Sequence, residues 1–309
     1  MKNIILDANT ISDIDKSVHK ILRGLGNPEP PLDLSTVLDL LNLDKQYYTN
    51  NDDGLLSEVI NRLTVAGKQI LQHPDSLWNA IRNFDLKALY IPEQKRIYID
   101  GDLHKIKHRW NEAHEIAHEI IPWHTDILLG DDKYTLSNAC HAQIEAEANY
   151  GAGRLLFLGK HFESAANDYD TRFKSILDLH NLYNNSITTT FWRFIECTHT
   201  ESKMFGMISE HPYYPKSPID PSAPCEYFIQ SQSFADEFSA DIINIYKQIE
   251  SCCSYRRQQI IGEGIIQIEN TNGQVYDFSI EIFCNYYQAL TLGRCIGEHK
   301  SIFTIPGQI

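Results

Sequence analysis

Apolar side chains recur every three or four positions through much of the first two hundred residues, which is the spacing of one buried face of an α-helix. The pattern is clear in ISDIDKSVHKILRGL (11–25) and in LSTVLDLLNL (34–43), and the Gly- and Pro-containing segment 26–31 separates the two. These positions predict a mainly helical N-terminal region. Further helical patterns cover residues 103–121, 137–158 and 170–196.

Two short β-like runs interrupt this helical region. Residues 87–91 (KALYI) and 96–99 (RIYI) are rich in aromatic and β-branched side chains, and Pro92-Glu93-Gln94-Lys95 joins them. We therefore expect a small β-sheet directly before the helix at 103–121.

The composition changes after Thr200, where proline recurs at every third position from Pro212 to Pro224. This spacing predicts an extended loop. A helical pattern follows at residues 233–249, and two strand-like runs then flank Asn272-Gly273, a strong hairpin signal. The two runs are GIIQIEN (264–270) and QVYDFSIEIF (274–283).

These patterns predict an α+β protein of two domains. The first, residues 1–200, is mainly helical, contains the small sheet and includes the helical segment 170–196. The second, residues 201–309, is a smaller α+β domain.

Composition excludes several classes of protein. The net charge of −14 and the pI near 5.3 give no global attraction to nucleic acid or to an anionic membrane. No run approaches the roughly 18 apolar residues of a spanning helix, and the N-terminus resembles neither a secretory signal nor a transit peptide. The seven cysteines show no CxxC spacing, which fits reduced thiols. We expect a cytoplasmic protein with no membrane partner.

One motif in the helix at 103–121 carries chemistry. His114 and His118 are four residues apart, about 6 Å along the axis, so both imidazoles project from one side and can bind a single Zn²⁺. Glu115 follows the first histidine, the position from which a carboxylate acts as general base toward a zinc-activated water. An ordinary amphipathic helix could carry the same five residues, so the interpretation needs a third ligand.

The next helix offers that ligand. Glu145, Ala148 and Ala152 lie on one narrow face, and the small side chains allow another helix to approach closely. We expect Glu145 to be the third zinc ligand. Glu147 points to a different side of the helix, where we expect it to face water, and it is the second candidate.

Other polar residues near the motif are weaker candidates. His124, His141, Tyr98 and Tyr150 could each stabilise an oxyanion, although packing or surface roles are commoner for such residues. Cys140 precedes the ligand helix and could touch the metal as a thiolate, although a small buried residue is the simpler interpretation.

In these motifs the chain resembles the ImmA/IrrE zinc metallopeptidases, a gluzincin-like family. Members carry an Arg-aromatic pair before HExxH, then Glu-x-x-Ala-Asn-x-x-Ala and a Leu-Leu pair. Gly151 departs from the family, which has an aromatic residue there, but no ligand or base is lost. The matching residues here are Arg109-Trp110, His114 to His118, Glu145 to Ala152 and Leu155-Leu156.

The resemblance implies a zincin-like fold and site-specific proteolysis. His114, His118 and Glu145 would hold Zn²⁺, and Glu115 would be the catalytic base. Relatives cleave a helix-turn-helix transcriptional repressor and so switch on a stress, phage-defence or mobile-element response. The strands at 87–91 and 96–99 would hold the substrate, and the second domain would be sensory, with an activating ligand or nucleic acid as its partner.

Two alternatives remain open at this stage. The chain could be a non-catalytic regulatory protein that binds DNA through residues 170–196, although that segment has few basic residues. Zinc could also serve only to hold the fold. Glu115 favours the enzyme over both, because neither role needs an acid at that position.

Overall fold

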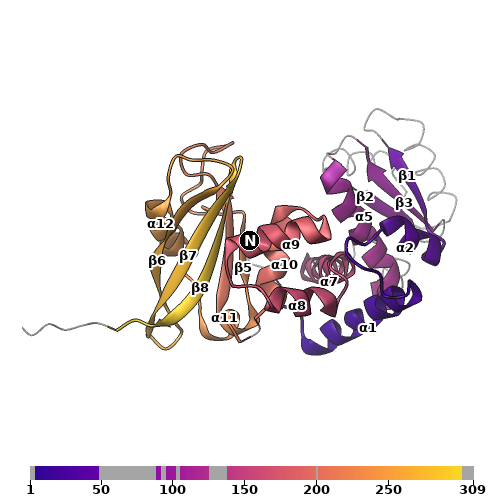
Figure 1. Ribbon diagram of the computed structural model, residues 1–309, viewed down its shortest axis with the longest axis horizontal. Coiled ribbons are helices and arrows are strands. Elements are labelled where there is room, and N and C mark those ends of the chain that lie inside the picture. The colour runs from indigo at the N-terminus through magenta and orange to yellow at the C-terminus, as the bar shows by residue number, and fades with distance from the viewer. Residues whose placement is uncertain are drawn as a thin grey trace, which may run out of the picture. The chain divides into compact units, whose positions relative to one another are not determined.

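The structure, a computed structural model, describes residues 4–48, 88–91, 95–101, 105–124, 138–199 and 201–300. Packing divides the chain into two compact units, each with its own sheet (Figure 1). The N-terminal unit comprises Leu6–Phe162 and His180–Ser186. The C-terminal unit comprises Met1–Ile5, Glu163–Leu179 and Ile187–Ile309. The sequence-based boundary near residue 200 differs from this division, because packing groups most of residues 163–200 with the C-terminal unit.

The sheet of the N-terminal unit has three described strands in the order β1-β3-β2. The central strand β3 (Arg96–Asp100) pairs in antiparallel register with β2 (Ala88–Ile91) and in parallel register with β1 (Asp44–Tyr48). The two strands expected from the sequence are present. β1 was not predicted, because its sequence DKQYY lacks an alternation of apolar and polar residues.

Helix α5 is the central helix of this unit, since it packs against β2, β3, α2 and α7. Helix α1 also packs against α7, and it begins where the Asp7 carboxylate accepts hydrogen bonds from the N–H groups of Asn9 and Thr10. The helices are α1 (Ala8–Gly24), α2 (Leu34–Leu41), α5 (Lys105–Ile120) and α7 (Asn138–Leu156). The helices predicted at 103–121 and 137–158 correspond to α5 and α7, which end at Ile120 and Leu156, slightly before the predicted ends. Residues 103, 104 and 137 lie outside the described residues.

Two polar contacts attach α5 to neighbouring segments. The Lys45 ammonium of β1 lies 2.9 Å from the Glu112 carboxylate. Burial opposes the charge of Lys45, but the attraction of Glu112 outweighs it and raises the lysine pKa. The Arg109 Nε donates to the Asn185 side-chain oxygen at 3.0 Å, and this contact links α5 to the segment His180–Ser186.

The C-terminal unit is built on a five-stranded antiparallel sheet with the order β5-β4-β8-β7-β6. The predicted Asn272-Gly273 turn lies in the hairpin between β6 and β7, as expected. Strands β4, β5 and β8 were not predicted. The strands are β4 (Met204–Glu210), β5 (Tyr227–Gln230), β6 (Ile260–Glu269), β7 (Val275–Asn285) and β8 (Gln288–Glu298).

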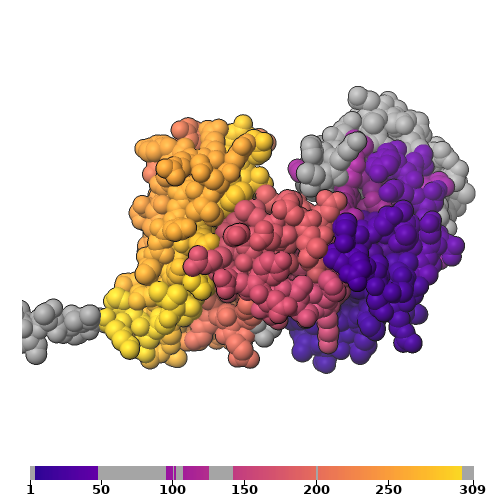
Figure 2. All heavy atoms as spheres, in the orientation of Figure 1, coloured from indigo at the N-terminus to yellow at the C-terminus, as the bar shows by residue number. Residues whose placement is uncertain are grey.

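Helices cover both faces of this sheet. Phe205 of β4 belongs to an apolar core with residues of α11 (Gln232–Glu237) and α12 (Ile242–Cys252). The next residue, Gly206, faces Phe191 and Ile195 of α10 (Ile187–Cys197), because successive residues of a strand point to opposite faces. Figure 2 draws all heavy atoms from the same side, and on this face the atoms of the sheet (yellow and orange) adjoin those of the helices labelled α9 and α10 in Figure 1.

The remaining helices correct one prediction and confirm another. The prediction of a single helix at 233–249 is wrong. The backbone is extended at Phe238, and this break separates α11 from α12. Asp241 then starts α12 by accepting hydrogen bonds from two N–H groups of the first turn. The segment 170–196 is helical, as predicted. It contains α9 (Phe173–Tyr183) and α10, and α8 (Lys160–Asn167) precedes them.

The α+β class is thus confirmed, with a mainly helical N-terminal region and a sheet-based region after it. Among the helices of the described residues, none is both long and apolar enough to cross a membrane.

Candidate metal centre

The candidate site begins on α5. Ala113, Ile116 and Ala117 are fully buried and form the face of α5 that packs into the core. His114 and His118 lie beside this face, one turn apart, and their Nε2 atoms are 3.2 Å from each other. The fixed helix face therefore holds two imidazole nitrogens close together without any contribution from a loop.

Small residues allow α7 to approach α5 closely. Ala148 and Ala152 are fully buried, and a Cβ added at Gly151 would lie only 3.1 Å from the Cβ of Ala117. The face expected from the sequence is thus the one that meets α5. The approach brings Glu145, near the middle of α7, to the two histidines.

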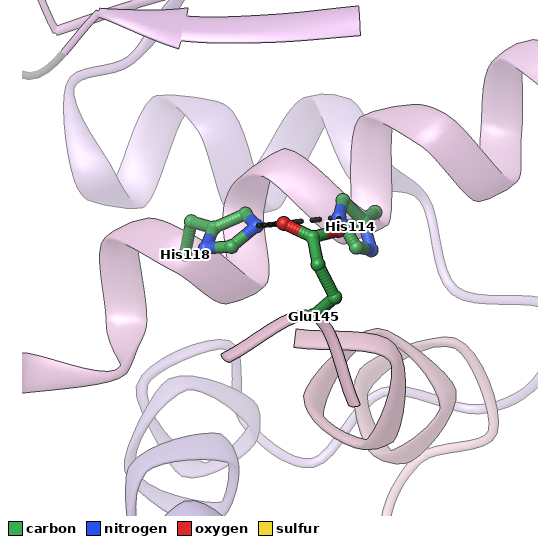
Figure 3. Close-up of side chains that lie close together, drawn as sticks. All are labelled: His114, His118 and Glu145. Atoms are coloured by element: carbon green, nitrogen blue, oxygen red, sulfur yellow. Dashed lines mark hydrogen bonds and ion pairs between the residues drawn. The ribbon is translucent and has the colours of Figure 1, made fainter. Parts of the chain in front are cut away.

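Figure 3 shows the three side chains pointing toward one another, with the histidines on α5 and the glutamate on α7. Glu145 Oε2 lies 3.3 Å from His114 Nε2, and Glu145 Oε1 lies 3.8 Å from His118 Nε2. Within the part of the chain that the structure describes, this is the group of three with donor atoms all within 4.8 Å of one another. Glu147, the second candidate for the third ligand, does not belong to this group.

The residues fit a zinc ion. Two imidazoles and one carboxylate are a donor set typical of catalytic zinc. Donor atoms at about 2.0–2.1 Å from a tetrahedral zinc lie about 3.4 Å from each other. Here the two imidazole nitrogens are 3.2 Å apart, and each lies 3.3 or 3.8 Å from one of the two carboxylate oxygens of Glu145. The Glu145 side chain is 41% exposed, whereas that of His118 is 9% exposed, so the group is accessible from the glutamate side.

The electrostatics of the group also favour a cation. Burial opposes protonation of His114, but the carboxylates of Glu145 and Glu115 outweigh burial and raise its pKa. Glu115 is itself buried next to this histidine. Two carboxylates, of which Glu145 is itself a candidate ligand, thus place negative charge beside imidazoles that would otherwise be neutral.

The second nitrogen of each imidazole has its own partner. His114 Nδ1 lies 3.0 Å from the side-chain oxygen of Asn149, and His118 Nδ1 lies 3.0 Å from His124 Nδ1. His124 is fully buried, and its Nε2 lies 2.9 Å from Glu147 Oε2. Burial lowers the pKa of His124 and outweighs the opposing effect of Glu147. The imidazoles therefore present Nε2, not Nδ1, to each other and to Glu145.

Glu147 is not a solvated surface residue, and that expectation is wrong. It is buried, and its carboxylate accepts hydrogen bonds from Trp123 Nε1 at 2.6 Å and from Gln143 Nε2 at 2.9 Å. Burial raises its pKa, but these hydrogen bonds and that of His124 outweigh burial and lower it. The reason is local: the turn after α5 carries Trp123 and His124 over this part of α7.

The weaker candidates take other places. Tyr98 is buried on the central strand β3, and the Tyr150 hydroxyl donates to Asp15 of α1 at 3.2 Å. His124 is fully buried and contacts His118 on the side away from Glu145. The contact of Trp123 with Glu147 was not predicted, because it depends on a turn that no local pattern predicts. The contact of Gln143 was also missed, although Gln143 lies one helical turn before Glu147 on α7. The side chains of Cys140 and His141 lie outside the described residues.

Comparison with known proteins adds a fold relationship. No family model and no curated protein sequence matches the chain. Among solved structures, a Mycobacterium tuberculosis transcriptional regulator matches with 14% sequence identity and a TM-score of 0.52. The match covers 96% of this chain and 93% of the other. At this identity the similarity shows a shared fold, and it extends over both units.

Proposed function

We propose that this protein is a zinc-dependent endopeptidase that cleaves a partner protein. The observation that supports this most is the convergence of His114, His118 and Glu145 from two packed helices, with Glu115 next to the first histidine. A site that only stabilised the fold would gain nothing from that buried acid, whereas peptide hydrolysis needs a base.

Each residue would have a distinct task. Bound zinc would supply a Lewis acid and a water of lowered pKa, near ~7. Glu115 would accept a proton on its carboxylate from the attacking water and return it to the leaving amine. His114, His118 and Glu145 would hold the ion and leave its exposed side open to a substrate carbonyl.

The small sheet suggests how a substrate would bind. β2 is terminal among the described strands of its sheet, it runs antiparallel to β3, and α5 packs against it. An extended peptide that added to β2 by backbone hydrogen bonds would lie beside the helix that carries the histidines. From the family resemblance, we propose a helix-turn-helix repressor as the substrate and a stress, phage-defence or mobile-element response as the outcome.

A non-catalytic regulatory protein is the second candidate, because the structural neighbour is named a transcriptional regulator. DNA binding through the segment 170–196 is disfavoured by packing. In α10 the side chains of Thr190, Phe191 and Arg193 are buried, so this helix would have to leave its own core before it could read a DNA groove.

One experiment separates the two candidates. Zinc content should be measured for the wild type, Glu115→Gln and Glu145→Ala. Cleavage should be measured for the same three proteins with a library of peptides derived from a denatured proteome. We expect about one zinc per chain in the wild type and in Glu115→Gln, and little in Glu145→Ala. Cleavage by Glu115→Gln should fall by about a thousandfold. Equal cleavage by the wild type and Glu115→Gln would overturn the peptidase and leave the regulator.

A further inference from the structure

A buried chain of hydrogen bonds extends from His118 away from the candidate ion. The turn after α5 starts at Ile121, whose carbonyl accepts the backbone N–H of His124 at 3.0 Å. This turn places the His124 ring between His118 and Glu147, with Nδ1 3.0 Å from one and Nε2 2.9 Å from the other. Both ring nitrogens of a fully buried histidine are thus committed.

The positions of the protons follow from the end of this chain. A carboxylate only accepts hydrogen bonds, so His124 Nε2 must carry the proton that Glu147 accepts. A neutral imidazole then has an acceptor at Nδ1, and His118 must donate from its own Nδ1. The remaining nitrogen, His118 Nε2, keeps its lone pair and faces His114 and Glu145.

The hydrogen bonds that Glu147 accepts fix its carboxylate in place. The fixed carboxylate in turn determines which nitrogens of His124 and His118 carry protons. Trp123 donates to its Oε2 at 2.6 Å and Gln143 donates to its Oε1 at 2.9 Å, in addition to His124. Three donors fix both oxygens of a buried carboxylate. His114 has a simpler arrangement, in which the exposed residue Asn149 is the partner of Nδ1.

We infer that His124 and Glu147 are positioning residues for the metal: they fix the tautomer and the ring orientation of His118 so that Nε2 is available to the ion. The inference rests on the metal site of the proposed function. Outer partners of metal-bound histidines typically affect metal affinity by about 10- to 100-fold when removed.

The test compares four variants at the two residues, and one control variant, with the wild type. His124→Phe and Glu147→Leu remove the chain of hydrogen bonds at similar volume. His124→Asn keeps an acceptor for His118, and Glu147→Gln keeps one for His124. Tyr183→Phe is the matched control, because it removes a buried hydroxyl that contacts His161 in the same unit without touching the site.

Two quantities should be measured for each protein. The first is the dissociation constant for zinc, by competition with a chromogenic chelator, together with thermal unfolding of the metal-free protein. The second is the tautomer of His118 in the metal-free protein, from ¹⁵N NMR of the imidazole nitrogens. The second quantity does not depend on zinc or on activity.

We expect His124→Phe and Glu147→Leu to bind zinc about 10- to 100-fold more weakly, and the conservative variants and the control to stay within about tenfold of the wild type. His118 should carry its proton on Nδ1 in the wild type and lose this preference in His124→Phe. An unchanged tautomer and unchanged zinc affinity in both disruptive variants would overturn the inference. If His124→Phe does not fold, Glu147→Leu decides. Failure of the wild type to bind zinc would instead refute the proposed function, and the tautomer would still decide the role of His124.

Discussion

Two residues of the same type, one helical turn apart, are held in the candidate centre by partners of different kinds. The Nδ1 partner of His118 is a fully buried histidine, whereas that of His114 is the amide of exposed Asn149. An exposed neutral hydrogen bond exchanges with water at small cost, but a buried one does not. Substitution of the Nδ1 partner should therefore weaken zinc binding more for His118 than for His114.

Asn149→Ala tests this difference. We expect the variant to bind zinc less tightly by no more than about tenfold, the low end for partners of metal-bound histidines, because water can replace the lost amide oxygen. Chelator competition measures the affinity, and Asn149→Asp, which keeps an acceptor, is the control. A loss as large as that of Glu145→Ala would contradict the expectation and would make Asn149 part of the ligand set.

Single residues also show what sequence could and could not reveal. His114 and His118 were identifiable because helical spacing places them on one side of the helix, and Glu115 because it follows the first histidine of the pattern. Glu145 was identifiable from the small residues that follow it on its face. The burial of Glu147 was not, because it depends on the turn that places His124 against α7.

At the scale of elements, the centre depends on how closely α5 and α7 pack. The contact at Gly151 is tight on two sides, since an added Cβ would lie 3.1 Å from Ala117 and 3.3 Å from Ile121. Larger side chains there would push the helices apart and move Glu145 away from the histidines.

Gly151→Leu should therefore weaken zinc binding as well as the fold. Overpacking of a core costs about 1–3 kcal/mol in the free energy of unfolding, which denaturant titration of the metal-free protein would measure. Gly26→Ala is a useful control, because the backbone there has a positive φ of 77° but no atom lies within 4 Å of the added Cβ. It should destabilise the protein without changing zinc affinity. Unaltered zinc affinity in Gly151→Leu would show that the helix spacing is not decisive.

A second contact holds α1 against α7. Asp15 Oδ2 accepts a hydrogen bond from Arg154 Nη2 at 3.0 Å, Asp15 Oδ1 forms an ion pair with Nε at 2.5 Å, and the arginine side chain is only 2% exposed. Asp15→Ala would leave this guanidinium buried without its carboxylate, at a cost of about 3 kcal/mol in unfolding free energy. Asp13 pairs with Lys16 on the exposed side of the same helix, so Asp13→Ala should cost less than about 1 kcal/mol. Equal effects of the two variants in denaturant unfolding would contradict the expectation.

The elements themselves were predictable to different degrees. Helices α1, α2, α5 and α7 have apolar residues that recur at helical spacing, and Asn272-Gly273 identifies the turn of its hairpin. β1 was missed because its sequence lacks an alternation of apolar and polar residues and it is held in the sheet by a partner about fifty residues away. The break between α11 and α12 was missed because Phe238 continues an apolar pattern while its backbone is extended.

At the scale of the whole molecule, stability should decline in alkaline solution through the C-terminal unit. Burial, followed by the charge of neighbouring groups, raises the pKa of Cys253 from 9.0 to about 12 and that of Tyr246 from 10.0 to about 12. The unfolded chain therefore loses these protons before the folded chain does. The free energy of unfolding should be insensitive to these groups below about pH 9 and should fall as the pH rises toward 12.

The double variant Cys253→Ala/Tyr246→Phe removes both groups. Its unfolding free energy, measured by denaturant titration between pH 8 and 12, should change less steeply with pH than that of the wild type. Because only the slope is compared, any loss of stability caused by the smaller side chains does not affect the result. Identical slopes would assign the alkaline sensitivity to other residues.

The path of the chain through its two units has a consequence for genetic dissection. The N-terminal unit is assembled from two stretches, Leu6–Phe162 and His180–Ser186, with residues of the other unit between them. A stop codon near position 200 would also remove β4, so that α10 would lose the strand against which it packs. Phe191 and Ile195 of α10 contact that strand at Gly206. Because each unit is built from separate stretches of the chain, no single cut in the gene yields either unit intact. The two units therefore cannot be exchanged separately between related proteins and should be inherited together.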